Sequence, residues 1–183
     1  MRNLLLVVLL ALVAGAVFAN QSSGQSRQNA QDGLILRADE GERIVRRWGY
    51  PAIIKVDPKN GGSENFVVIT EVVAPGKSIP VHKHPHADEV VVLLQGTGVA
   101  IVGETRRPIE AGSMLFAPKG AWMGFQNTGS EDARVMGIFS RLRYEDYLRA
   151  TSVPEGQPVT PLSPGELASI RKRFADHITF QQQ

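Results

Sequence analysis

The chain has 183 residues, of which 43% are hydrophobic and 21% are charged, so we expect one globular domain with its own core and short appendages. Its 20 basic and 18 acidic residues give a net charge of +2, and no basic stripe with interleaved aromatic residues occurs, which argues against a nucleic-acid partner. The absence of cysteine excludes disulfides and an anchor attached through a thiol.

The N-terminal segment predicts export. Arg2 precedes an apolar run from Leu4 to Phe18, and the residues before Asn20 resemble a signal-peptide cleavage site. The alternative is an uncleaved membrane anchor, but the run is shorter than the span of about 20 residues that a membrane requires. We therefore predict a signal peptide over residues 1–19, no stable membrane anchor after cleavage, and a periplasmic or secreted protein. The polar residues 20–40 form a leader that we expect to be flexible.

Residues 41–140 contain many short apolar runs separated by segments rich in Gly, Pro, Asn and Asp. This pattern predicts short strands packed as a sandwich or small barrel, an all-β fold. The expected strands are residues 43–47, 52–56, 65–73, 79–83, 89–94, 98–102, 106–109, 114–117, 122–126 and 133–139.

Residues 141–183 predict a helical, proline-containing C-terminal extension. A short helix is expected over residues 144–150, and Ser163 followed by Pro164 and Glu166 is typical of a helix start. We expect this second helix to end near His177. Its apolar residues recur at helical spacing, so one stripe is free to dock on the barrel or on a second subunit; we expect a homodimer. The stripe consists of Leu167, Ile170 and Phe174.

The segment between Gly76 and Gly96 carries a candidate metal-ligand set. His82 and His84 are separated by one residue, so in an extended chain their side chains point to the same face. Glu89 comes at the start of the next predicted strand, after a turn-forming stretch around Pro85. Imidazoles with a carboxylate are ligands that divalent transition metals select. The sequence therefore predicts an inward-facing metal site.

Two motifs resemble those of the cupin superfamily. Gly76, His82, His84, Glu89 and Gly96 match every spacing of its first motif, and Gly112, Pro118, Gly120 and Asn127 match its second. The resemblance implies a jelly-roll barrel with a metal site inside it, and usually a homodimer. It leaves the activity open, since cupins include dioxygenases, decarboxylases, isomerases, sugar-binding regulators and storage proteins.

Met123 stands where the second motif has a histidine that would be the fourth metal ligand. Three interpretations follow. Met123 packs while the two histidines and Glu89 hold the metal as a triad; or Met123 joins the ligands and shifts the preference towards copper; or Met123 fills a core that has lost its metal.

Other residues near the motifs are expected to shape the pocket. We expect Phe116, Met123 and Phe125 to line an apolar pocket, and His86 to lie behind the ligands or at the solvent edge. His177 is predicted to enter no site. Two pairs of arginines, Arg46 with Arg47 and Arg106 with Arg107, are typical of solvated strand edges. The alternative is that one arginine of each pair points inward and holds an acidic substrate.

These observations predict an exported protein that binds a divalent metal (Fe, Mn, Zn or Cu) and acts on a small oxygen-rich molecule, as an oxygenase or isomerase does. The alternative is a barrel that binds a small ligand or copper without turnover.

Overall fold

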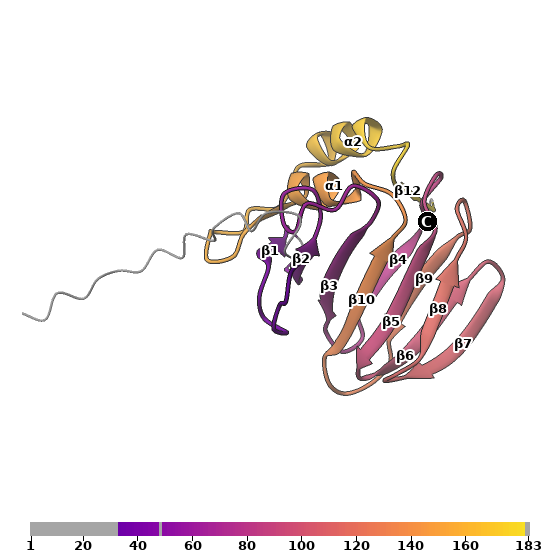
Figure 1. Cartoon of the computed structure of the whole chain (residues 1–183). Coiled ribbons are helices and arrows are strands. Elements are labelled where there is room, and N and C mark those ends of the chain that lie inside the picture. Colours follow the sequence, from indigo (N-terminus) through magenta and orange to yellow (C-terminus); the bar gives the residue numbers. More distant parts are fainter. Residues whose placement is uncertain (1–32, 48, 182–183) are drawn as a thin grey trace, which may run out of the picture.

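The computed structural model describes residues 33–47 and 49–181, so the predicted signal peptide and most of the leader lie outside the described residues. Two antiparallel sheets face each other and form a jelly-roll barrel, as predicted (Figure 1). In the described part of the chain, no helix is both long enough and apolar enough to cross a membrane.

The larger sheet has the order β11-β1-β2-β3-β10-β5-β8, and the smaller one has the order β12-β4-β9-β6-β7. The strands of the larger sheet are β1 (Glu42–Arg46), β2 (Pro51–Val56), β3 (Val67–Val73), β5 (Glu89–Gln95), β8 (Met114–Ala117), β10 (Ala133–Phe139) and β11 (Ser152–Pro154). Those of the smaller sheet are β4 (Ser78–Lys83), β6 (Thr97–Val102), β7 (Thr105–Glu110), β9 (Met123–Asn127) and β12 (Thr179–Phe180).

Each strand expected from the sequence is present, with ends that move by two residues at most. The alternation of buried and half-buried side chains is clearest in β10, where every second residue from Ala133 to Phe139 is buried. This strand pairs with both β3 and β5. Two strands were not predicted, β11 and β12. Both come from the C-terminal extension, and they pair with β1 and β4.

The core consists of two clusters of buried side chains. One fills the space between the sheets and includes Leu93, Leu115 and Phe125. The other lies under the helices at one end of the barrel and includes Ile54 and Tyr147. His82, His84 and Glu89 lie within the barrel at this helix-covered end, beside Phe139 and Tyr144.

The helices are α1 (Tyr144–Ala150) and α2 (Pro164–Arg173), and Figure 1 shows both at the same end of the barrel. The predicted start of α2 is confirmed, because the Ser163 side chain accepts a hydrogen bond from the Glu166 backbone and the Glu166 carboxylate accepts one from the Ser163 backbone. The predicted end near His177 is wrong. The backbone leaves the helix at Phe174 (φ −107°, ψ 16°), and the chain then turns back towards the barrel.

The C-terminal extension packs on the barrel of its own chain. Phe174 is buried and its ring lies 5.9 Å from that of Tyr147, while Leu167 and Ile170 are half-buried. The predicted stripe therefore covers the end of the barrel, and the homodimer stays a prediction.

The last residues of the predicted leader are attached to the barrel. The buried Lys55 ammonium group donates hydrogen bonds to the backbone carbonyls of Arg37, Ala38 and Glu40 at 2.6 to 2.9 Å. These bonds compensate for removing the charge from water. Residues 37–40 are therefore held against the barrel by Lys55.

Candidate metal centre

The fold brings His82, His84 and Glu89 together. His82 lies near the end of β4 and His84 directly after it, while Glu89 begins β5 in the opposite sheet. The connection through Pro85 crosses from one sheet to the other, so the imidazoles and the carboxylate face each other inside the barrel. One ligand atom of each residue lies within 4.8 Å of the others, and all three side chains are buried.

The histidine rings are held by backbone carbonyls. Nδ1 of His82 lies 2.7 Å from the carbonyl oxygen of Pro80, and Nδ1 of His84 lies 2.6 Å from that of His177. A carbonyl only accepts hydrogen bonds, so a neutral ring must carry its proton on Nδ1. Nε2 of each ring is then left as a free lone pair, which is the arrangement common in metal-ligating histidines.

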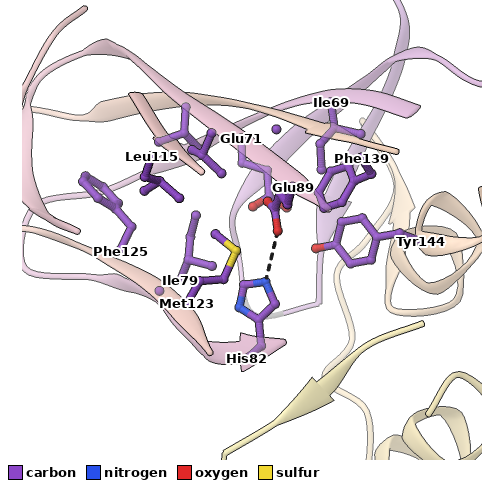
Figure 2. A pocket seen from close by; sticks show the side chains of 14 residues that line it. Ile69, Glu71, Ile79, His82, Glu89, Leu115, Met123, Phe125, Phe139 and Tyr144 are labelled. Atoms are coloured by element: carbon purple, nitrogen blue, oxygen red, sulfur yellow. Dashed lines mark ion pairs between the residues drawn. The ribbon is translucent and has the colours of Figure 1, made fainter. Parts of the chain in front are cut away.

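Both Nε2 atoms face the same carboxylate oxygen. Oε2 of Glu89 lies 3.2 Å from Nε2 of His84 and 3.9 Å from Nε2 of His82. Figure 2 shows the pair of His82 and Glu89. Within the described residues, His84 Nε2 and Glu89 Oε2 are buried and make no hydrogen bond of normal geometry. Lone pairs that face an ionised carboxylate in a dry interior repel unless a proton or a cation lies between them.

The electrostatics of the three side chains agree with this geometry. Burial lowers the pKa of His82 and of His84 to about 4, so both rings are neutral at pH 7. Burial raises the pKa of Glu89 to about 8, so without a cation this carboxyl keeps its proton. A divalent ion would replace that proton. The donor set, two neutral imidazoles and one carboxylate, therefore fits a divalent transition metal.

Met123 lies beside the ligands. It is buried, it pairs in register with His82 across β4 and β9, and it lines a cavity of about 20 Å³ with His82 and Glu89. That volume suits a single ion or water molecule. Figure 2 shows the Met123 sulfur and the His82 ring on the same side of the cavity.

The predicted pocket residues divide between the inside and the outside of the barrel. Phe125 lines the cavity, as Met123 does. Phe116 does not: its side chain is 51% exposed, so its assignment to the pocket is wrong. The pairing of β5 with β8 explains this, because Glu89 faces inward opposite Ala117, which turns Phe116 outward. Leu115 forms that wall instead.

The remaining histidines have different roles from the ligands. His86 is exposed and lies at the solvent edge of a shallow hollow near His84. His177 was predicted to enter no site, and this is wrong for its backbone, because its carbonyl orients His84. Carbonyl contacts of this kind carry no side-chain signal in a sequence.

Three further residues lie at the site that the sequence did not assign to it. Arg46 points inward, the alternative that the sequence left open for its pair, and its guanidinium lies 2.7 Å from the Glu71 carboxylate. Glu71 and Tyr144 line the metal cavity. Tyr144 comes from α1, and its ring packs against that of His84 at 4.8 Å. Only the tertiary fold brings this helix to the barrel.

A larger pocket adjoins the metal cavity. Its volume is about 290 Å³, and it shares four lining residues with the cavity: Glu71, Ile79, His82 and Tyr144. A small molecule in this pocket would therefore reach the ligand side of the metal centre.

Comparison with known proteins agrees with the geometry. A family model for the cupin domain matches residues 69–139, which include the three ligand residues. Protein SchB of Streptomyces halstedii is 30% identical over 106 residues, 58% of this chain and 76% of SchB. Auxin-binding protein 1 of Arabidopsis thaliana is 33% identical over 100 residues, 47% of this chain and 50% of that protein. The structure of KdgF from Halomonas sp. superimposes with a TM-score of 0.55 at 18% identity, over 62% of this chain and 98% of KdgF.

Proposed function

We propose that this chain, which belongs to the cupin superfamily, binds a divalent transition metal through His82, His84 and Glu89 and acts as a metal-dependent enzyme on a small oxygen-rich molecule. The adjoining pocket would hold that molecule. Auxin-binding protein 1, one of the similar proteins, is named for binding a small molecule, which supports a ligand of this size class.

One observation carries the metal proposal. Two backbone carbonyls hold the Nδ1 protons of both histidines, so both Nε2 lone pairs are directed at one buried carboxylate oxygen. A core without a ligand role would avoid this arrangement, because buried polar atoms without partners destabilise the fold.

A bound ion would supply Lewis-acid polarisation of an oxygen on the small molecule. The protein contributes orientation and a dry environment. Burial raises the pKa of Tyr144 well above its usual value, so its hydroxyl stays protonated and is able to donate a hydrogen bond to a ligand oxygen. Apolar side chains such as Ile69, Leu115 and Phe139 line the cavity and limit the access of water.

Metal analysis of protein purified without a polyhistidine tag tests the proposal. We expect close to one transition-metal ion per chain in the wild type and a loss of at least ten-fold in metal affinity for His82→Ala. His86→Ala is the matched control, because His86 is exposed and directs no atom at the carboxylate. Stoichiometric metal that survives His82→Ala, or none in the wild type after loading, would refute the proposal.

A non-catalytic copper module is the second candidate, and the position of Met123 is the observation that favours it. A thioether binds Cu(I) well and hard divalent ions poorly. The variant Met123→Leu distinguishes the metal-dependent enzyme from the copper module. The content of divalent metal is unchanged if Met123 only packs, whereas bound copper is lost if the Met123 sulfur is a ligand.

We also propose that the protein is exported through cleavage after residue 19 and forms a homodimer. The apolar run and the residues before Asn20 support the first. Mass spectrometry of protein from the exported fraction would locate the mature N-terminus, and light scattering would measure the oligomer. A mature chain that begins at Met1, or a monomer at micromolar concentration, would refute the respective proposal.

A further inference from the structure

The larger pocket lies between the mouth of the barrel and the C-terminal extension. Its wall towards the barrel comes from β3 and β4, and the opposite wall comes from α1, α2 and β12. The extension contributes Tyr144, Tyr147, Leu167, Arg171, Ile178 and Phe180. The pocket is therefore completed by a segment that the matched cupin domain, residues 69–139, does not contain.

The walls of this pocket are apolar and aromatic. Tyr50, Tyr144, Tyr147 and Phe180 line it, and Val73, Ile79 and Ile178 fill the space between them. Several aromatic faces favour a ligand that has an aromatic ring of its own, because aromatic rings stack with other rings and with guanidinium groups. A volume of about 290 Å³ suits a small molecule rather than a peptide.

The charges of the pocket leave one cation for a ligand. Arg46 and Glu71 form a buried ion pair, so together they contribute no net charge. Arg171 lies at the exposed rim with its guanidinium carbon 4.7 Å from the centroid of the Phe180 ring. Among the described residues, no carboxylate forms an ion pair with Arg171. The pocket thus favours an anion.

A second polar group points to the same ligand. The Tyr147 side chain is fully buried and lines the pocket, and its hydroxyl donates no hydrogen bond of normal geometry within the part of the chain that is described. Burial raises the pKa of Tyr147, partly opposed by the positive charges of Arg46 and Arg171 and by a hydrogen bond from the Arg171 side chain, so the hydroxyl is protonated at pH 7 and its own proton is available to a ligand. A buried donor without a partner destabilises a protein unless something accepts its proton.

We propose that this pocket binds a small aromatic acid, with its carboxylate at Arg171 and the Tyr147 hydroxyl as a further donor. The ring lies between the aromatic walls, and oxygen substituents at the far end point to His82, His84 and Glu89. The orientation of the ligand's oxygen substituents towards His82, His84 and Glu89 rests on the proposed function. The carboxylate subsite depends only on residues of the C-terminal extension, Arg171 and Tyr147.

The position of Arg171 in the last turn of α2 has another explanation, since cations are favourable at the C-terminus of any helix. Lys172 and Arg173 occupy the same turn and meet that preference equally. Neither lines the pocket; Arg173 instead lies over the ring of Phe174 at 4.8 Å. Arg173 is therefore a matched control for Arg171, with the same charge, the same helix turn and a similar ring contact.

The test compares aromatic acids with their uncharged amides. The probes are the benzoate, phenylacetate and cinnamate forms of a ring with two adjacent hydroxyls, each with its carboxamide, titrated at pH 7 by calorimetry. The wild type should bind at least one acid about ten-fold or more tightly than its amide. Arg171→Gln should remove that preference and leave affinity for the amide within about two-fold, while Arg173→Gln should change neither.

Two results would overturn the proposal: no acid binds the wild type more tightly than its amide, or Arg171→Gln weakens acid and amide equally. Measuring the metal content of the same samples separates this proposal from the metal function. A preference for the acid that depends on Arg171, in a wild type that takes up no metal after loading, would keep the carboxylate subsite and refute the metal centre. Metal binding without that preference would do the reverse.

Discussion

Binding of a divalent metal to the metal-free protein at pH 7 should release close to one proton, and Glu89 is its source. Burial raises the pKa of Glu89 to about 8, so at pH 7 about nine in ten molecules carry a proton that the metal must displace. His82 and His84 have a pKa of about 4 and are already neutral, so they release none. The expected release is therefore about 0.9 proton per ion.

Calorimetric titration in buffers of different ionisation enthalpy measures this number directly, because the apparent enthalpy changes linearly with the enthalpy of buffer protonation. At pH 9 Glu89 is mostly ionised before binding, and the release should fall to about 0.1 proton. Glu89→Gln keeps the shape of the side chain and removes the proton, so any metal that this variant still binds should release almost none.

Exposed Glu104 supplies the control, since it lines neither the metal cavity nor the adjoining pocket and Glu104→Gln should leave the release unchanged. The reasoning is refuted if the wild type binds metal at pH 7 without releasing a proton, or if the release is the same at pH 7 and pH 9.

Further predictions concern stability and the support of the metal centre. The pKa of Glu89 in the folded, metal-free protein is raised from 4.5 to about 8, so its contribution to stability is present below pH 4.5 and is lost as pH rises through 8. In urea unfolding with a chelator, the free energy of unfolding of the wild type should therefore fall relative to that of Glu89→Gln by a few kcal/mol across this range. Equal pH profiles would contradict this. Gly137→Ala should lower metal affinity about ten-fold, because the added Cβ would lie 3.0 Å from the Phe139 ring and 3.4 Å from Glu89 Oε1. Unchanged affinity in a metal titration would show that the cavity accommodates the added methyl group. Phe174→Ala should destabilise the protein by about 3–5 kcal/mol in urea unfolding, against a smaller loss for the half-buried Leu167→Ala, and equal losses would show that α2 is not anchored through Phe174.

The strands and the ligand set were predictable because both depend on local chemistry. The spacing of two along an extended chain is set by covalent geometry, so His82 and His84 had to share a face. The glycines of the motifs show the same local logic. Gly96, for example, has φ 89°, a backbone conformation that glycine adopts without strain and that residues with a Cβ rarely adopt.

The errors came from pairings between distant segments. Phe116 was placed inside because it lies near Met123 and Phe125 in sequence, but its direction is set by the register of β8 against β5. The role of the His177 carbonyl depends on where α2 ends and how the chain returns to the barrel. Neither depends on a local pattern of side chains.

The sequence by itself determined the barrel, the candidate ligands His82, His84 and Glu89 and the unusual methionine beside them, because periodicity, turn residues and motif spacing are properties of neighbouring residues. Only the tertiary structure decided which atoms of these three side chains face one another, which face of β8 is inside, and that Tyr144, Tyr147 and Arg171 of the C-terminal extension complete a pocket beside the candidate metal centre. The physical reason is that hydrogen bonds and burial between segments far apart in the chain depend on how the whole molecule packs. A motif carries no record of that packing.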